Sequence, residues 1–569
     1  MSVAIGRTQA TFCATLVDEL MAGGLRHAVI CPGSRSTPLA IAIGASALTT
    51  HVRLDERSAG FFALGLARAT KQAVLVLVTS GTAAAELHAA VVEAQLDRVS
   101  LIIATADRPP ELHGIGSPQT MHQEGLYGDH VVFSAMPGPC HAWPENLWRP
   151  FASRLILESL GSNGRPGPVH VNLPFIEPLV SEADALPASP RPGQAFYTAA
   201  PAAPGEMTLA SSHRCVVIAG DGIGDAEVFL AQSAVMQWPV LADPRSGLRS
   251  GAEHVIASGD ALLRSEVVKA TLDPSVIILA GAPPASKIVN EWIVDCAGRG
   301  TEIVVLGHDG PSRHPTQVSA TFVSGEPSAI LENFAATASP GESSWLHRWQ
   351  ESQSIVLDAQ ATVFGDGTFC EPSVAVTLSQ LGSDVTLVSS SSMPIRDLEW
   401  FGVNTGQSTR VVANRGANGI DGVVSTAMGV ATALTTSVVA VVGDLAFFHD
   451  VSALVDGVDD DSGLTVVVLD NGGGGIFSFL AQRQLLDGDV FEEFFGTPRR
   501  PDVLSVARGF DAEAREVNSH PEFLEALSAA QGQTGVHVIV ARMPSRDENV
   551  ARHELLHGEA VKALATALG

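Results

Sequence analysis

The chain has 569 residues, which suits three or four domains at roughly 150 residues each. Its 34 basic and 61 acidic residues give a formal net charge of −27, so we expect no nucleic-acid partner and no attraction to anionic lipid. No apolar run approaches the ~20 residues of a membrane-spanning helix, and the six cysteines form no CxxC pair; we therefore expect no membrane insertion, no zinc site and a cytoplasmic location.

Short β-branched runs alternate with Ala- and Leu-rich stretches, which predicts an α/β fold built on mostly parallel sheets flanked by helices. In the first third, strands are expected at residues 27–31, 51–54, 73–79, 101–105 and 169–173. Helices are expected between them, at residues 58–69 and 83–96. Residues 1–183 are therefore predicted to form a first α/β domain.

Residues 184–207 are rich in Pro and Ala, which is typical of an extended linker. A central α/β domain is predicted over residues 208–340, with strands at 215–219, 276–280 and 302–306. The alternation resumes over residues 350–569, with strands at 385–389, 410–413, 438–442, 464–469 and 536–541. We expect three domains, of which the first and the last share one architecture.

Polar and Gly-rich residues gather where the predicted strands end. Residues 33–36, 55–56 and 80–82 follow strands of the first domain, and residues 443–444 and 470–473 follow strands of the last. Ligands of open parallel sheets bind beyond the carboxyl ends of the strands. Because both sheets have such residues at the carboxyl ends of their strands, we predict that one ligand is held between the two domains.

Asp444 and Asn471 follow two of these strands. Their oxygens suit Mg²⁺, and the glycines of residues 472–475 let the backbone approach a diphosphate closely. The alternative is a Gly-rich loop that only caps a helix. Glu56, taken alone, is better explained as a residue that favours a helix N-terminus.

Together these features resemble the thiamine-diphosphate-dependent enzymes. More specific motifs resemble the family of 2-succinyl-5-enolpyruvyl-6-hydroxy-3-cyclohexene-1-carboxylate (SEPHCHC) synthases. They are CPGSRSTPLAIA (31–42), LDERSAGFFALGLA (54–67), TSGTAAAEL (79–87), TADRPPEL (105–112), NRGANGIDG (414–422) and NGGGGIFS (471–478). The resemblance covers the first and last thirds and, more faintly, the middle. It implies a pyrimidine-binding domain, a central domain and a diphosphate-binding domain.

The resemblance implies thiamine diphosphate and Mg²⁺, for which Mn²⁺ can substitute, as cofactors. It also implies decarboxylation of 2-oxoglutarate and 1,4-addition of the remaining fragment to isochorismate, in menaquinone biosynthesis. The metal ligands would be Asp444, Asn471 and Gly473. The cofactor-binding residues would be Glu56, Ser80, Gly81, Thr82, Ser392, Ile420, Gly443, Asp444, Leu445, Asn471, Gly473, Gly474, Ile476 and Phe477.

By the same resemblance, Glu56, Gln119, Arg396 and Arg415 would act in catalysis. The residues implied to bind substrate are Ser34, Arg35, Arg108, Gln119, Ser392, Arg396, Arg415 and Lys287. The charges agree, because both substrates are dicarboxylates and arginine binds carboxylates bidentately. A structural salt bridge remains the alternative for each arginine, and core packing for Ile420.

Two positions depart from the family pattern. Pro118 precedes Gln119 where an Asn is common, which removes one expected polar contact with substrate. Ile288 follows Lys287 where a second basic residue can occur, which leaves the contribution of the central domain open.

In this family the site lies between the first domain of one subunit and the last domain of another. The resemblance therefore implies a homodimer, or a dimer of dimers. The alternative functions are another thiamine-diphosphate 2-oxo acid decarboxylase or carboligase, such as an acetohydroxyacid synthase, and a non-catalytic protein that keeps the fold. A nucleotide-binding dehydrogenase has only the Gly-rich residues 220–224 in its favour.

Overall fold

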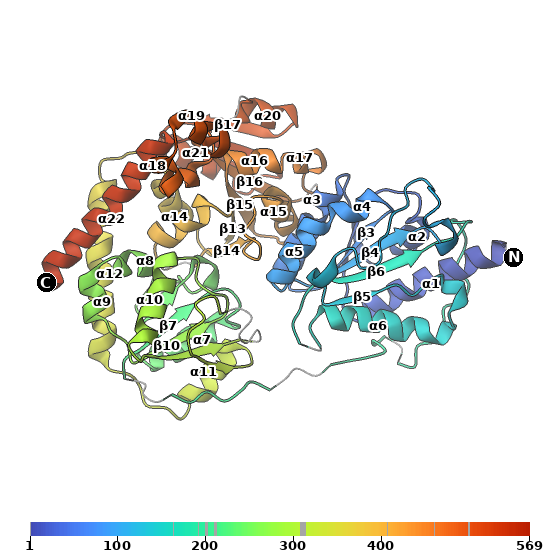
Figure 1. The fold of residues 1–569 in the computed structure, drawn as a ribbon, viewed down its shortest axis with the longest axis horizontal. Coiled ribbons are helices and arrows are strands. Elements are labelled where there is room, and N and C mark those ends of the chain that lie inside the picture. The colour runs from blue at the N-terminus through green and yellow to red at the C-terminus, as the bar shows by residue number, and fades with distance from the viewer. Residues whose placement is uncertain are drawn as a thin grey trace.

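The computed structural model describes residues 2–162, 164–191, 193–199, 203–209, 213–307, 314–404, 406, 408–459, 461–498 and 501–569. Within these residues the chain forms three six-stranded sheets with helices packed around them (Figure 1). Every pair of hydrogen-bonded strands in them is parallel. The predicted α/β fold class is thereby confirmed.

The first sheet has the strand order β2-β1-β3-β4-β6-β5. Its strands are β1 (His27–Ile30), β2 (Thr49–Val52), β3 (Val74–Val78), β4 (Leu101–Asp107), β5 (Phe133–Ala135) and β6 (Val169–Pro174). Its helices are α1 (Ser2–Ala22), α2 (Thr37–Gly44), α3 (Glu56–Thr70), α4 (Thr82–Glu86), α5 (His88–Leu96) and α6 (Trp148–Ser159). The central strands β3 and β4 are buried along their whole length, as apolar runs between two helical layers require.

The last sheet repeats this arrangement strand for strand, in the order β14-β13-β15-β16-β18-β17. Its strands are β13 (Val385–Ser389), β14 (Arg410–Ala413), β15 (Ser437–Gly443), β16 (Gly463–Asp470), β17 (Glu513–Val517) and β18 (Gly535–Arg542). Its helices include α13 (Glu371–Leu378), α14 (Met393–Phe401), α15 (Val423–Ala433), α16 (Asp444–His449), α17 (Ala453–Asp456), α18 (Ala481–Leu485), α19 (Gly488–Phe491), α20 (Val503–Gly509), α21 (His520–Ala530) and α22 (Arg546–Leu568). The expected common architecture of the first and last thirds is present.

The central sheet has a different order, β12-β11-β10-β7-β8-β9. Its strands are β7 (Cys215–Ala219), β8 (Val240–Ala242), β9 (Val255–Ile256), β10 (Val276–Ala280), β11 (Glu302–Leu306) and β12 (Thr321–Val323). The surrounding helices are α7 (Ala226–Val235), α8 (Gly259–Leu263), α9 (Glu266–Thr271), α10 (Lys287–Gly298), α11 (Pro327–Ala335) and α12 (Ser343–Phe364). The described part of the predicted linker, 184–191, 193–199 and 203–207, contains no helix or strand; residues 192 and 200–202 lie outside the described residues.

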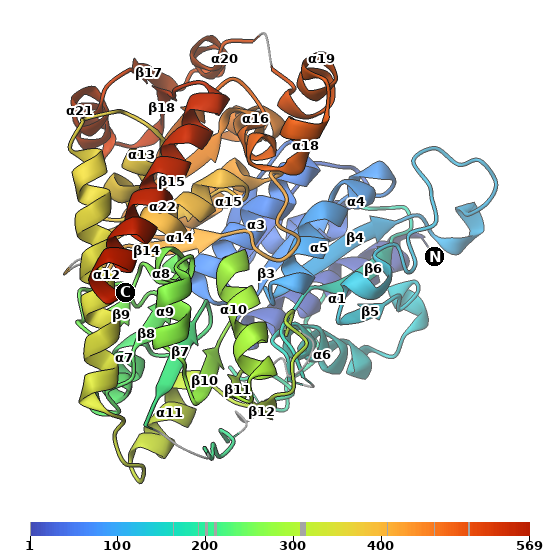
Figure 2. The same cartoon turned by 60° about the vertical axis from the view of Figure 1, so that its left-hand side comes forward.

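The first and last domains pack through α3 and α15, which lie against each other at the centre of a shared hydrophobic core (Figures 1 and 2). Two glycines permit this close approach. A Cβ on Gly65 would lie 2.1 Å from the Thr426 carbonyl oxygen, and one on Gly429 would lie 2.0 Å from the Phe62 carbonyl oxygen. The absence of side chains at these two positions therefore fixes the distance between the two domains.

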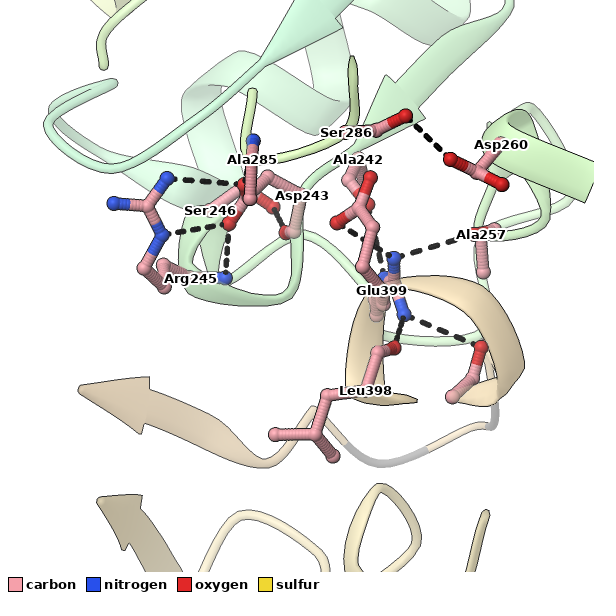
Figure 3. A network of polar contacts seen from close by, with 12 residues as sticks. Ala242, Asp243, Arg245, Ser246, Ala257, Asp260, Ala285, Ser286, Leu398 and Glu399 are labelled. Atoms are coloured by element: carbon pink, nitrogen blue, oxygen red, sulfur yellow. Dashed lines mark hydrogen bonds and ion pairs between the residues drawn. The ribbon is translucent and has the colours of Figure 1, made fainter. Parts of the chain in front are cut away.

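A buried polar network joins the central domain to α14 of the last (Figure 3). The Arg249 guanidinium donates to the carbonyls of Leu398 and Gly402 at 2.8 and 3.2 Å, and also to those of Ala242 and Ala257. The Glu399 carboxylate lies 3.7 Å from it. Burial and the neighbouring Asp243 raise the pKa of Glu399 to about 8. The cost of burying the guanidinium is offset by carbonyls drawn from both domains.

The helix α22 leaves the last domain and runs along α12 beside the central sheet (Figures 1 and 2). Its residues Ala560 and Leu564 belong to the same apolar cluster as Trp345 and Trp349 of α12 and strand residues of the central sheet. The core of the central domain is therefore completed by a helix that comes from the end of the last one. None of the helices in the part of the chain described above is both long and apolar enough to cross a bilayer.

Candidate active site

A cavity of about 390 Å³ lies at the carboxyl edge of the last sheet, where β13, β14, β15 and β16 end. All residues that the sequence predicts from the last third line it. They are Ser392, Arg396, Arg415, Ile420, Gly443, Asp444, Leu445, Asn471, Gly473, Gly474, Ile476 and Phe477. The structure thus brings together in one cavity side chains that are spread over more than 80 positions of the sequence.

Asp444 is the first residue of α16, directly after β15. Its carboxylate is buried and accepts a hydrogen bond of 2.8 Å from the Leu445 backbone N–H. Burial, with the nearby Asp470 as a second cause, raises the pKa of Asp444 to about 7. A buried carboxylate with so few positive neighbours is stabilised when a cation binds beside it.

Asn471 follows the neighbouring strand β16, and its two amide atoms differ in their surroundings. The Nδ2 group donates to Glu371 Oε1 at 2.7 Å, whereas Oδ1 is buried and has no hydrogen-bond partner. Gly475 makes room for this side chain, because a Cβ there would lie 2.5 Å from Asn471 Nδ2. A buried amide oxygen without a donor is available to a metal ion.

Gly473 completes the group of oxygens beside Asp444 and Asn471. Its φ of +137° and the Gly496 carbonyl oxygen, 2.1 Å from where a Cβ would be, require glycine here. The Gly473 carbonyl accepts one hydrogen bond, from the Gly475 N–H at 2.9 Å, and keeps a second lone pair. A carboxylate, an amide oxygen and a carbonyl are hard donors of the kind that Mg²⁺ prefers.

Two arginines line the cavity together with the carboxyl groups of Asp444 and Glu371. Arg396 lies one turn into α14 and donates to the Ser392 carbonyl, and Arg415 follows β14. Burial lowers the pKa of Arg415 to about 10, with the guanidinium groups of Arg245 and Arg396 as further causes. Because neighbouring guanidinium groups repel one another, an anion that binds between them is stabilised.

The residues predicted from the first third lie at the carboxyl edge of the first sheet, and none of them lines this cavity. Ser80 and Gln119 bind each other through two hydrogen bonds, at 2.9 and 3.1 Å, and Arg108 donates to the Pro118 carbonyl at 3.3 Å. Arg35 is buried and donates to the Phe175 carbonyl at 3.0 Å. Arg35 also pairs with the Glu177 carboxylate at 3.4 Å, so it makes the kind of structural salt bridge that is the alternative to substrate binding for each arginine. The remaining predicted residues of this group are Ser34, Gly81 and Thr82.

Glu56 is the first residue of α3, and Asp55 before it caps the helix by accepting from the N–H groups of Arg57 and Ser58. Burial raises the pKa of the half-buried Glu56 carboxyl, and Asp55 and Glu86 contribute in the same direction. Asp55 thus caps α3, and the first position of the helix is also one at which the charge of Glu56 favours the helix N-terminus. Glu56 is left as an acid whose proton is held more tightly than usual, which suits a group that exchanges protons with a ligand.

The position of two residues relative to the cavity differs from the sequence-based expectation. The Lys287 side chain is 86% exposed, pairs with Glu291 at 3.4 Å and does not line the cavity. Glu371, which does line it, was not expected, because a lone Glu at the start of a helix carries no chemical signal in the sequence. Only its contact with Asn471, 100 positions away, reveals it.

Two family models match the chain. The N-terminal binding domain of thiamine pyrophosphate enzymes matches residues 10–126, and the C-terminal binding domain matches residues 402–541. Together with the fold and the cavity, these matches make the chain a thiamine-diphosphate-dependent enzyme.

Curated relatives define the family more narrowly. The SEPHCHC synthase of Bacillus velezensis is 38% identical, with 97% of each chain covered. That of Geobacillus kaustophilus is 37% identical over 98% of this chain and 99% of the relative, and that of Myxococcus xanthus is 36% identical over 96% and 97%. The chain belongs to the SEPHCHC synthase family, which favours that interpretation over an acetohydroxyacid synthase or a dehydrogenase.

Proposed function

We propose that this chain decarboxylates 2-oxoglutarate and adds the resulting succinic-semialdehyde fragment to isochorismate in a 1,4 sense, giving SEPHCHC in menaquinone biosynthesis. The observation that carries the proposal is the position of Arg396 and Arg415 in the same cavity as the oxygens of Asp444, Asn471 and Gly473. Both substrates are dicarboxylates, and two guanidinium groups beside a cofactor site can hold their carboxylates in fixed positions.

The cofactor assignment follows from the oxygens and glycines of the cavity. Asp444, Asn471 and Gly473 would hold Mg²⁺, or Mn²⁺ in its place, and the backbone N–H groups near Gly474 would face the diphosphate. Ile420 would support the cofactor from below. The other cavity residues proposed to contact it are Ser392, Gly443, Leu445, Ile476 and Phe477. Thiamine diphosphate, when bound, supplies a carbon nucleophile that accepts the electron pair released with CO₂.

The protein groups have separate tasks in this proposal. Glu56 would exchange a proton with N1′ of the aminopyrimidine ring, for which its raised pKa is suited. Arg396 and Arg415 would bind carboxylates from the last domain. Gln119, with Ser34, Arg35 and Arg108, would bind substrate from the first domain, and Ser80, Gly81 and Thr82 would contact the cofactor there. The exposed Lys287 stays a prediction.

A homodimer, or a dimer of dimers, is part of the proposal. The cavity is lined by residues between 371 and 477 alone, so the Glu56 side of the site would come from a second copy of the chain. A cytoplasmic location also stays a prediction; the six buried, unpaired cysteines support it.

The decisive assay uses the purified chain with thiamine diphosphate, Mg²⁺ and 2-oxoglutarate, and follows isochorismate loss and product mass. Isochorismate-dependent formation of the succinyl adduct is expected. Release of CO₂ without the adduct would agree with the thiamine chemistry but would refute isochorismate as the acceptor. No reaction of the folded protein with either substrate would refute the whole proposal.

A further inference from the structure

Glu371 is a buried carboxylate beside Asn471, one of the proposed metal ligands. It is the first residue of α13, it is 1% exposed and it lines the cavity. Two amide groups donate to its carboxylate: Asn471 Nδ2 at 2.7 Å, and the Asn549 side chain from α22. The Glu371 carboxylate is thus held by two amide groups, one of which belongs to the proposed metal ligand Asn471.

This contact decides which way the Asn471 amide points. An amide side chain can be turned by 180°, which exchanges its oxygen and nitrogen in almost the same space. With the oxygen turned toward the ionised Glu371 carboxylate, two acceptors would face each other without a proton between them, and the hydrogen bond of 2.7 Å would be lost. The Nδ2 group must therefore face Glu371, and Oδ1 is directed to the other side, where it has no protein partner.

We infer that Glu371 is a positioning residue for the cation: it holds the Asn471 amide so that Oδ1 is presented to a divalent metal ion in the cavity. The inference rests on the proposed function, since it assumes that Asp444, Asn471 and Gly473 bind Mg²⁺. Residues that orient metal ligands in this way commonly contribute 10–100-fold to metal affinity.

The test is the dissociation constant of Mg²⁺, measured by calorimetric titration of the full chain in saturating thiamine diphosphate. Glu371→Met, which has a similar length but no acceptor, should weaken Mg²⁺ binding by about 10–100-fold. Glu371→Gln should stay within about threefold of the wild type. Its amide oxygen can keep the bond with Asn471, while its new NH₂ group can donate to Asn549 Oδ1, which has no partner in the structure.

A double-mutant cycle separates positioning from a general structural role. In an Asn471→Ala background, Glu371→Met should change Mg²⁺ affinity by less than about twofold, because the amide that Glu371 orients is gone. Wild-type affinity in Glu371→Met, or an undiminished effect in the Asn471→Ala background, would overturn the inference. If Glu371→Met does not fold, Glu371→Asp takes its place, since it keeps the charge but cannot reach Asn471.

Asp397→Asn is the matched control. Asp397 is a second buried carboxylate of the same region, paired with His553 at 2.8 Å, and it has no contact with Asn471 among its hydrogen bonds. Its replacement should leave Mg²⁺ affinity within about threefold. Failure of the proposed function is distinguishable. Without the cofactor chemistry the wild type would bind neither Mg²⁺ nor thiamine diphosphate, whereas a wrong acceptor would appear in the turnover assay and leave these Mg²⁺ affinities unchanged.

Discussion

Individual residues of the candidate site are distinguished by their hydrogen-bond partners and by their burial. Asn471 Oδ1 is buried without a donor, burial and the nearby Asp470 raise the pKa of Asp444 to about 7, and Asp55 rather than Glu56 caps α3. The sequence indicated all three, because each belongs to a motif at a strand end. It did not indicate Glu371, whose role exists only through a contact between distant segments.

Glu56→Gln tests the proton-transfer role at this scale. The amide keeps the shape of the side chain but cannot accept and return a proton, so we expect turnover to fall by about 10²–10⁴-fold. Thiamine diphosphate should still bind, within a few-fold of wild-type affinity by calorimetry. Glu111→Gln, at an exposed acid of the same domain, is the control. Wild-type turnover in Glu56→Gln would remove Glu56 from its proposed role.

Helices and strands were predicted well where they are apolar and central. Strands such as β7, β10 and β13 have the predicted bounds, whereas β2 begins and ends two residues earlier than expected. The strands β5, β8, β9, β12 and β17 were not expected. Four of them have three residues or fewer, and β17, with the sequence EAREV, is a mostly polar edge strand stabilised by pairing with β18. Such strands depend on their neighbours, which local composition cannot show.

The contact between α3 and α15 makes a prediction at the scale of elements. Gly429→Ala places a methyl group against the Phe62 backbone oxygen, where a Cβ would be 2.0 Å away, so the helices must separate. We expect a loss of about 1–3 kcal/mol in the free energy of unfolding, measured by urea denaturation. Gly558→Ala in α22, where nothing lies within 4 Å of the new Cβ, should instead stabilise by about 0.5–1 kcal/mol. Equal effects at the two positions would contradict the packing argument.

Over the whole molecule, the domains are joined by contacts that cross the predicted boundaries. The sequence predicted boundaries at residues 183, 207 and 340 from composition, and these stay predictions. The shared core around α3 and α15, the Arg249 network and the course of α22 could not be predicted, because each joins segments that are far apart in the sequence, by 149 positions between Arg249 and Leu398.

The interface between the central and last domains predicts a pH dependence of stability. Glu399 has an ordinary pKa of 4.5 and a folded-state pKa of about 8, so between these values the folded chain holds a proton that the unfolded chain has lost. The free energy of unfolding should fall as pH rises through this range, by up to about 1.4 kcal/mol per pH unit, relative to Glu399→Gln. Urea denaturation of both proteins at several pH values measures this difference. Parallel curves would show that the pKa of Glu399 is not raised in the folded chain.

Subunit mixing tests whether each site is shared between two chains. Glu56→Gln and Asp444→Ala should each be nearly inactive alone, the second because it loses metal and cofactor affinity. If Glu56 and Asp444 of one site come from different chains, a mixed dimer has one intact site. Random exchange should then restore about a quarter of wild-type activity. No recovery, with mixed dimers demonstrated by mass spectrometry, would place both residues in one chain.

The course of α22 has a consequence for how the chain folds during its synthesis. Ala560 and Leu564 complete the core beneath the central sheet, whose strands end at residue 323. A ribosome that has made the central strands must therefore add more than 200 further residues before their core can close. The apolar cluster that packs α1, α2 and α6 against the first sheet contains only residues before 180, so this part of the first domain can form early. The middle of the chain is thus among the last parts to reach its final form.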